Sequence, residues 1–243
     1  MQLYRLPYYV ALFATALVFT TGCVKNDTDT TTTGSGSSID STFTTGTAEG
    51  STETAADEDD LVENSTFSST VTIDFGTTVT VTNPLDGNGV TVTTSGADVS
   101  VTSTIAGVAY VISGTTTDGT VKIYSSNKYK VTLNGANITN SDGPALNLQS
   151  KKRAFIVLAD GTTSTLVDGA SYATSTEDQK GTIFAEGQVI FSGTGTLNLT
   201  GKYKHAICSD QYVRIREGNI TVTSAVGDGI HTNDAFIADG GTV

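Results

Sequence analysis

Apolar and polar residues alternate along most of the chain from residue 67 onward. The segments 71–82 (VTIDFGTTVTVT), 90–103 (VTVTTSGADVSVTS) and 121–133 (VKIYSSNKYKVTL) all show this period of two. Such alternation is typical of β-strands that bury one face. No amphipathic helix pattern follows residue 67, so the sequence predicts an all-β domain over residues 67–243.

A longer repeat is superimposed on this alternation. Four segments share a small residue, then Leu or Ile, and an oxygen-bearing side chain three positions later: ALNLQ (145–149), TIFAE (182–186), AICSD (206–210) and GIHTN (229–233). Their apolar markers Leu146, Ile183, Ile207 and Ile230 are 37, 24 and 23 residues apart. The longer first spacing predicts an insertion, for which residues 170–180 are the candidate.

Two more short strands follow each marker. Second strands are predicted at 153–159, 188–193, 212–217 and 235–241, and third strands at 193–201 and 216–224, with 135–141 in the same position one coil earlier. Three strands and three corners in about 23–24 residues make one coil of a three-sided, right-handed parallel β-helix. Each coil would bury its apolar side chains and pair its backbone with the coils on either side.

Both ends of this domain break the regular repeat. The strands within 67–112 are more closely spaced and predict either a cap or a small sandwich. Residues 237–243 enter a third strand and stop part-way round a coil without a capping element, which leaves strand edges open. We therefore expect the domain to be truncated at its C-terminus or to be covered there by another element.

The net charge of the chain limits the kinds of molecule that it can bind. The chain of 243 residues has a formal net charge of −12, which disfavours nucleic acid because phosphates need Lys and Arg. Ten of the 25 carboxylates lie in residues 24–66 beside Lys25 alone, so the predicted β domain is only mildly acidic. Of the two cysteines, Cys208 is expected to be a small buried side chain without a disulfide partner.

The N-terminus predicts export. Residues 1–22 read as a signal peptide, with Arg5 near the start and an apolar run over 10–19 that is too short to span a membrane comfortably. Small residues then precede Cys23, which resembles the processing site of bacterial lipoproteins, although Thr20 stands where such sites usually carry Leu. The alternative is an ordinary signal peptide that happens to contain a cysteine.

Lipidation of Cys23 would anchor the chain to a membrane, at the outer membrane or the cell surface. Residues 23–66 are rich in Thr, Ser, Gly, Asp and Glu, so they predict a disordered acidic tether. The acidic run 56–64 (ADEDDLVEN) is interpreted as a solvated, self-repelling spacer, with calcium binding as the alternative.

Five short motifs recur in order along the β domain: SDGPA, LADGT, SGTGTL, VGDGI and DGGTV. With the longer stretches 110–169, 191–215 and 218–243, they make residues 67–243 resemble the bacterial β-helical carbohydrate-binding domain family. The resemblance implies a pectate-lyase-like fold, binding of cellulose- or pectin-like polysaccharide, and bound calcium.

Oxygen-bearing side chains recur once in each coil. Gln149, Glu186, Asp210 and Asn233 should form one file, with equivalent positions about 4.8 Å apart. The candidate calcium ligands are Glu186, Asp210, Asp228, Asn233 and Asp234, because calcium takes six to eight oxygen ligands. The alternatives are a ladder of hydrogen bonds along the file, and a turn at 227–234 in which Asp caps backbone amides.

A second set of residues could contact sugars: His205, His231, Arg214, Arg216, Tyr203 and Tyr212. The histidines could bond hydroxyls or a uronate, the arginines could attract an anionic polymer, and the tyrosines could stack on sugar rings. Tyr124, Tyr129 and Tyr172 are further aromatic surfaces. The alternatives are histidines without a special role, arginines that serve solubility, and tyrosines that pack in the fold.

These features favour a non-catalytic, calcium-associated polysaccharide-binding lipoprotein. The second hypothesis is a polysaccharide lyase or a glycoside hydrolase, but no motif isolates a lyase base beside calcium or a pair of hydrolytic carboxylates. Arg214 is the only arginine well placed among the Asp-bearing coils to act as a lyase base. The third hypothesis is a surface adhesin or structural stalk.

Overall fold

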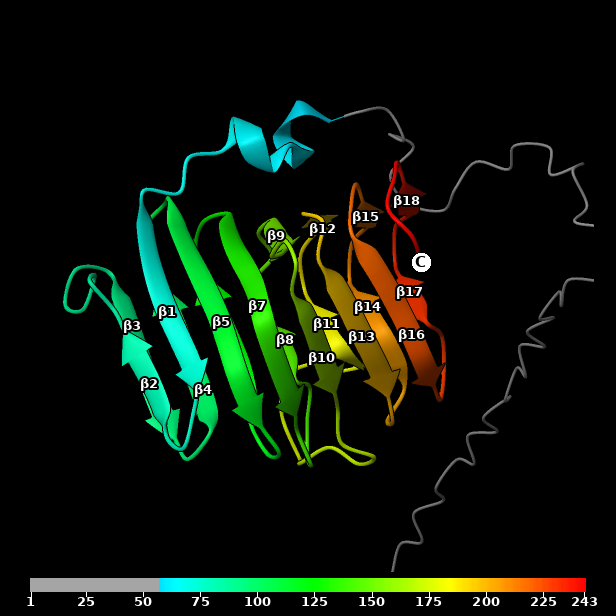
Figure 1. The fold of residues 1–243 in the computed structure, drawn as a ribbon, viewed down its shortest axis with the longest axis horizontal. Coiled ribbons are helices and arrows are strands. Elements are labelled where there is room, and N and C mark those ends of the chain that lie inside the picture. Colours follow the sequence, from blue (N-terminus) through cyan, green and yellow to red (C-terminus); the bar gives the residue numbers. More distant parts are fainter. Residues whose placement is uncertain (1–56) are drawn as a thin grey trace, which may run out of the picture. The chain divides into compact units, whose positions relative to one another are not determined.

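The computed structural model describes residues 57–243 (Figure 1). Two short 3-10 helices, η1 (Glu58–Asp60) and η2 (Val62–Asn64), come first. The strands that follow are β1 (Ser69–Phe75), β2 (Val79–Thr82), β3 (Val90–Ser95), β4 (Asp98–Ser103), β5 (Val108–Thr116), β6 (Thr120–Ser125), β7 (Tyr129–Thr139), β8 (Leu146–Leu148), β9 (Ala154–Leu158), β10 (Thr163–Val167), β11 (Gly181–Ala185), β12 (Val189–Ser192), β13 (Thr196–Gly201), β14 (His205–Ser209), β15 (Val213–Ile215), β16 (Asn219–Ala225), β17 (Ile230–Thr232) and β18 (Phe236–Ala238). The described part is therefore all-β, as predicted. None of its helical turns is long or apolar enough to cross a membrane.

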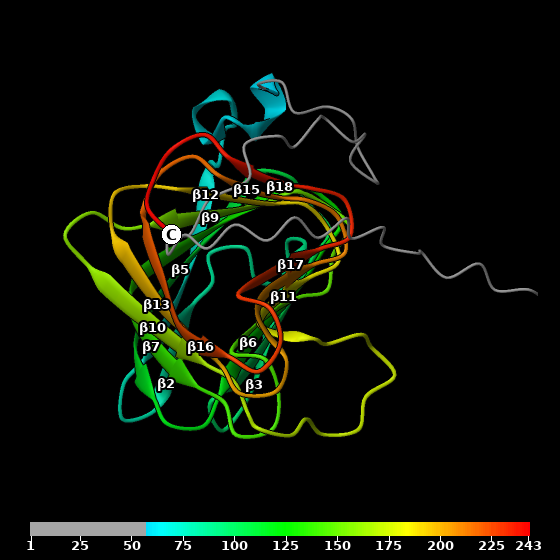
Figure 2. The same ribbon diagram turned by 90° about the vertical axis from the view of Figure 1, so that its right-hand side faces the viewer.

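The strands form two mixed sheets (Figure 2). The seven-stranded sheet has the order β17-β14-β11-β8-β6-β4-β3. The eleven-stranded sheet has the order β16-β13-β10-β7-β9-β12-β15-β18, and β1, β2 and β5 join it beside β7. Within the described strands, β1–β2 and β3–β4 pair antiparallel and the other pairs are parallel.

Parallel pairing places the predicted marker residues directly beside one another. Leu146 pairs with Ile183, Ile183 with Ile207, and Ile207 with Ile230 across β8, β11, β14 and β17. The predicted register of these four segments is therefore confirmed. The spacing of 37 residues is absorbed by the irregular segment 168–180 between β10 and β11, which we call the insertion.

The predicted position of segment 135–141 was wrong by one strand of the eleven-stranded sheet. Ile138 of β7 pairs with Leu166 of β10, and Leu166 pairs with Leu199 of β13. Segment 135–141 thus lies two strands before β13, with β10 between them. The sequence prediction missed β10 because its five residues, TSTLV, contain only two apolar positions.

The N-terminal strands belong partly to the regular stack and partly to its end. β4 pairs in parallel with β6, and β1 pairs in parallel with β5. Only β2 and β3 run antiparallel to their neighbours, and β3 is the terminal strand of the seven-stranded sheet. Of the two predicted alternatives, this arrangement fits a cap better than a separate sandwich.

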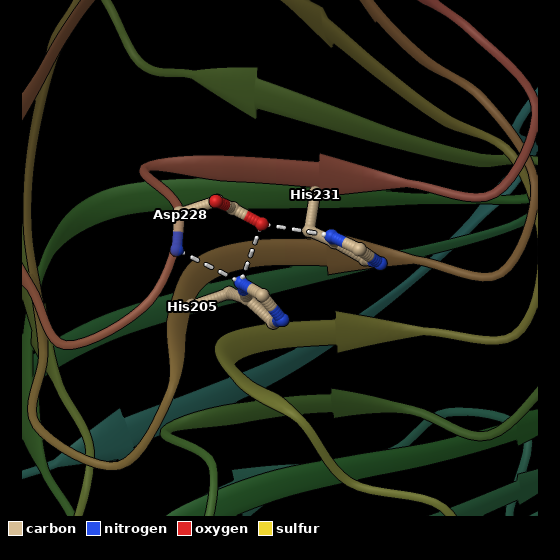
Figure 3. Close-up of side chains that lie close together, drawn as sticks. All are labelled: His205, Asp228 and His231. Atoms are coloured by element: carbon tan, nitrogen blue, oxygen red, sulfur yellow. Dashed lines mark hydrogen bonds and ion pairs between the residues drawn. The ribbon is translucent and has the colours of Figure 1, made fainter. Parts of the chain in front are cut away.

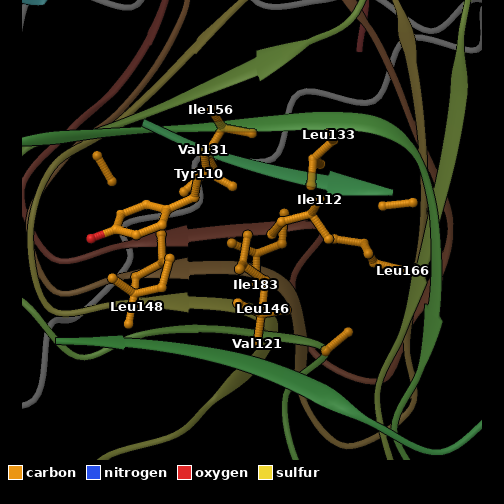
Figure 4. Packing of buried hydrophobic residues seen from close by; sticks show 14 of the residues in the cluster. Tyr110, Ile112, Val121, Val131, Leu133, Leu146, Leu148, Ile156, Leu166 and Ile183 are labelled. Carbon is orange, nitrogen blue, oxygen red and sulfur yellow. The ribbon is translucent and has the colours of Figure 1, made fainter. Parts of the chain in front are cut away.

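The core lies between the sheets, where side chains from opposite walls meet (Figure 4). Val121, Leu146 and Ile183 come from the seven-stranded sheet and are fully buried. Each buried side chain of this size contributes roughly 1.5–3 kcal/mol. Glycine makes the close approach of neighbouring turns of chain possible: at Gly193 φ is 82°, and a Cβ there would lie 2.3 Å from the carbonyl oxygen of Leu158.

Residues 57–67 form a strap across the outer face of β9, β12 and β15 (Figures 1 and 2). Asp60 of the strap is 1% exposed and lies 2.7 Å from Arg153 Nε and 2.6 Å from Arg214 Nη1. Phe67 packs edge-on against Phe155, with ring centroids 5.9 Å apart. The prediction of a solvated spacer was therefore wrong for this part of the acidic run, because two outward-facing arginines compensate the buried carboxylate.

The substitution Asp60→Ala should destabilise the domain by about 3–5 kcal/mol, because it leaves Arg153 and Arg214 without their buried counter-charge. Urea unfolding of the two proteins would measure this difference. The matched control is Asp59→Ala, whose side chain is 72% exposed and should change stability by less than about 0.5 kcal/mol. Equal effects of the two substitutions would contradict a role of Asp60 in holding the strap.

Candidate functional site

One file of outward-facing residues runs along the whole seven-stranded sheet. Pairing of neighbouring strands places its members side by side in the order Thr93, Ser100, Lys122, Asn147, Phe184, Cys208 and His231. Phe184 and Cys208 are 0% and 1% exposed, although they face away from the core. The file therefore has a polar first part, a covered apolar middle and an imidazole at its far end.

The polar part of the file borders a groove of about 400 Å³ over β3, β4 and β6, which we call the strand groove. All but one of its lining residues carry a polar group, although carbon atoms make up most of the exposed lining: Thr93, Thr94, Ser95, Asp98, Val99, Ser100, Thr120, Lys122 and Tyr124. Burial raises the pKa of Asp98, and repulsion by the carboxylates of Asp142 and Asp118 raises it further. The groove thus offers hydroxyl groups, a cation, a carboxylate and one aromatic ring.

Glu177 of the insertion contacts two residues that line this groove. Lys122 Nζ donates to Glu177 Oε2 at 2.7 Å, and the Tyr124 hydroxyl donates to the other carboxylate oxygen. Burial alone would raise the pKa of Glu177, but the hydrogen bonds from Lys122 and Tyr124 outweigh it and the pKa is lowered. Burial and the same bond raise the pKa of Tyr124 to about 12. Glu177 is therefore held as a carboxylate.

A second cavity of about 220 Å³ continues the strand groove, with which it shares Thr120 and Lys122. We call it the amide pocket. Its other lining residues come from the corner before β8, from β8 and from the insertion: Asn140, Asp142, Gly143, Pro144, Asn147, Ala173, Thr174, Ser175 and Gln179. Sequence reasoning missed this pocket. The only signals for it were the interrupted spacing at the insertion and the SDGPA corner.

The structure brings together three of the predicted site residues: His205, Asp228 and His231 (Figure 3). The two imidazole rings are stacked, with centroids 4.3 Å apart and an interplanar angle of 17°. The Nδ1 atoms of His205 and His231 lie 3.3 Å and 2.9 Å from Asp228 Oδ2. The bond from His231 lowers the pKa of Asp228, while burial and the neighbouring His231 lower the pKa of His205.

Two imidazoles and a carboxylate are ligand types that suit zinc and other transition metals better than calcium. Two features of this cluster oppose such a site in the observed conformation. The backbone N–H of Asp228 donates to His205 Nδ1 at 3.0 Å and so occupies that lone pair. The nearly parallel rings also direct their remaining lone pairs side by side and not toward one point. The cluster is best described as a hydrogen-bonded stack.

The residues predicted to bind calcium are not gathered into one site. Within the described residues, the cluster of His205, Asp228 and His231 is the only group of three or more His, Cys, Asp or Glu side chains close enough to share an ion. Asp210 instead lies 3.8 Å from Lys180 Nζ and accepts from Asn233 Nδ2 at 3.4 Å. Glu186 and Asp234 join no such group in this part of the chain, so these side chains do not by themselves gather around one ion, and calcium binding stays a prediction.

Most of the predicted sugar contacts have partners within the fold. Arg214 is 2% exposed and binds Asp60 and Asp239, and Tyr212 donates to Asp60 at 2.7 Å beneath the strap. Burial and Asp60 raise the pKa of Tyr212 to about 12, despite the opposing effect of Arg153. Arg216 lies 3.3 Å from Glu63 of the strap.

Tyr203 is the predicted sugar-contact residue with the most exposed aromatic ring. It is 42% exposed and stacks on Tyr172 of the insertion, with centroids 4.1 Å apart. Cys23, the predicted lipidation site, lies outside the described residues.

Comparison with known proteins identifies relatives of this chain. A family model described as "Carbohydrate-binding domain-containing protein" matches residues 86–243. A protein of Acetivibrio thermocellus with the same description is 29% identical over 118 residues, which cover 46% of this chain and 41% of that relative. The match thus spans less than half of the relative's length.

A solved structure described as the polysaccharide lyase-like protein from C. thermocellum, a gadolinium derivative, matches with a TM-score of 0.58. The alignment covers 71% of this chain and 80% of that one, at 22% identity. At this identity the likeness concerns the fold alone.

The lowered pKa of His205 predicts a pH-dependent stability. Because the folded protein keeps His205 neutral and the unfolded chain takes up a proton near the ordinary value of 6.5, the stabilising contribution is present above that pH and is lost as the pH falls through the lower folded pKa. The urea concentration at the midpoint of unfolding should therefore decrease as the pH is lowered from 7.5 to 5.5. The variant His205→Asn keeps an acceptor for the Asp228 amide and should show a smaller decrease; an equal decrease would refute this origin.

Proposed function

The chain belongs to the carbohydrate-binding domain-containing protein family, and from this membership we propose that it binds cellulose- or pectin-like polysaccharide without cleaving it. The observation that carries the proposal is the strand groove. It crosses three neighbouring strands, so its polar side chains form a surface that continues from strand to strand. Hydroxyl groups of a sugar chain can exchange hydrogen bonds with Thr, Ser and Asp, and Tyr124 offers a ring for stacking.

Two observations support binding without catalysis. Arg214, the one arginine considered as a lyase base, is held by Asp60 and Asp239 beneath the strap. Glu177 beside the groove is paired with Lys122 and remains ionised, so it is poorly suited to donate a proton.

Cleavage of the polysaccharide is the second candidate function. The solved neighbour is described as lyase-like, and the groove region contains two carboxyl groups, Asp98 and Glu177, whose pKa values are shifted in opposite directions. Such divergence is found in hydrolytic sites. A test of binding must therefore also look for products.

The finer fold that this function needs is a right-handed parallel β-helix with three-sided coils. Its support is the parallel register of markers 24 and 23 residues apart, together with the rule that connections between parallel strands of one sheet are right-handed in about 98% of cases. Stacked coils would repeat sugar contacts at regular intervals along the groove.

In a pull-down, the full chain in detergent should be retained on insoluble cellulose or on polygalacturonate. Tyr124→Ala should weaken retention about two- to twelve-fold, the loss expected for one aromatic contact of about 0.5–1.5 kcal/mol. The matched control is Phe236→Ala, which removes an exposed aromatic ring of β18 outside the strand groove and should leave retention unchanged.

Two further measurements in the same experiment separate the alternatives. Ultraviolet absorbance of unsaturated uronides, or new reducing ends, would show cleavage and would refute a purely binding role. Chelator should reduce retention if calcium takes part, as the family resemblance implies. No retention on either polysaccharide would overturn the proposed function.

Anchoring at Cys23 is the second part of the proposal, since a domain that binds extracellular polymer needs export and retention. In a bacterial host, the full chain should incorporate labelled palmitate and sediment with the membrane fraction. Cys23→Ser should abolish both, whereas Cys208→Ser, which alters a buried thiol, should retain the label. Labelling of Cys23→Ser would contradict the lipoprotein assignment.

A further inference from the structure

An unsatisfied hydrogen-bond donor lies in the wall of the amide pocket. Asn147, the central residue of β8, is 1% exposed, and its Nδ2 has no hydrogen-bond partner among the described residues. A buried donor without a partner costs about 1–3 kcal/mol. Buried amides of folded proteins are rarely left in this state without a reason.

The orientation of this amide is fixed by its neighbours. Gln149 Nε2 donates to the backbone carbonyl of Asp178 at 2.9 Å, and a carbonyl can only accept. The same Nε2 donates to Asn147 Oδ1 at 2.8 Å, so the oxygen of Asn147 must face Gln149. The Nδ2 group therefore lies on the other side of the amide, and turning the amide over would break the bond to Gln149.

The charge around the pocket decides what kind of acceptor can meet this donor. Lys122, the cation of the pocket, is already paired with Glu177 at 2.7 Å. Asp142 lines the pocket. The nearby carboxylate of Asp98 interacts electrostatically with those of Asp142 and Asp118. The surroundings are therefore net negative, which disfavours an anionic acceptor such as a uronate carboxylate.

An uncharged acceptor that can also donate to carboxylates suits these surroundings. Water and a sugar hydroxyl both meet this requirement, whereas a metal ion cannot accept from an amide N–H. The cavity of about 220 Å³ has room for several water molecules at about 30 Å³ each, and hence for one sugar ring. Continuity with the strand groove through Thr120 and Lys122 allows this ring to belong to a bound chain.

We propose that the amide pocket binds one uncharged sugar residue of the polysaccharide, with Asn147 Nδ2 donating to a hydroxyl oxygen and Asp142 accepting from a hydroxyl group. This assignment rests on the proposed function and refines it. The pocket selects neutral hexose over uronate at that position of the bound chain.

Calorimetric titration of the full chain with cellohexaose and with hexagalacturonate tests the assignment. We expect cellohexaose to bind more tightly, and Asn147→Ala to weaken it about ten-fold, as expected for one lost hydrogen bond. The matched control is Asn198→Ala, which removes an amide from β13, outside both cavities, and should leave affinity unchanged.

A second variant keeps the test decisive if Asn147→Ala does not fold. Thr174 is an exposed residue of the insertion that lines the pocket, so Thr174→Trp should fill the cavity without touching the core and should weaken cellohexaose by a similar factor. Two results would refute sugar binding in the amide pocket: tighter binding of hexagalacturonate, or unchanged cellohexaose affinity in both Asn147→Ala and Thr174→Trp. Retention on insoluble polysaccharide would then still support the proposed function. Absence of binding by the unmodified chain to every glycan would overturn both.

Discussion

Parallel pairing in register is the constraint on which the rest of this molecule depends. Once Leu146, Ile183 and Ile207 are paired, the other residues of their strands are assigned to the core or to the outside. The same pairing aligns Lys122, Asn147 and Phe184 in one outward file. Each strand therefore contributes one side chain to a given file on the surface. An apolar residue in place of a polar one at that position makes the surface apolar there.

Some outward-facing side chains are apolar, and others are paired with a buried charge. Both kinds are shielded from water by other parts of the chain. The strap covers Arg214 and Phe155 on the eleven-stranded sheet. Phe184 and Cys208 are buried on the outer side of the seven-stranded sheet, where Cys208 lies near Lys180 of the insertion. Burial of Cys208 raises the pKa of its thiol to about 12, so this cysteine is an inert packing residue. The strand groove exists where these covers end and the file becomes polar.

Sequence alone could predict the inward face but not most of the site. The period of two and the spacing of the markers report burial directly, which is why the strands around Ile183, Ile207 and Ile230 were placed correctly. The environment of an outward residue depends on segments far away in the chain: Asp60 meets Arg214 across 154 positions. In an acidic run Asp60 reads as solvated, and Asn147 reads as one more polar residue of a strand.

The insertion is the part of the chain that converts a repetitive surface into a specific one. Within four residues it contributes Glu177 to Lys122 and Tyr124, the carbonyl of Asp178 to Gln149, and Lys180 to the neighbourhood of Asp210. These contacts fix the wall of the amide pocket at one end of the covered stretch and reach toward the imidazole stack at the other. Because the paired strands supply only a regular scaffold, differences in sugar preference among relatives should follow the length and sequence of this insertion more closely than those of the strands.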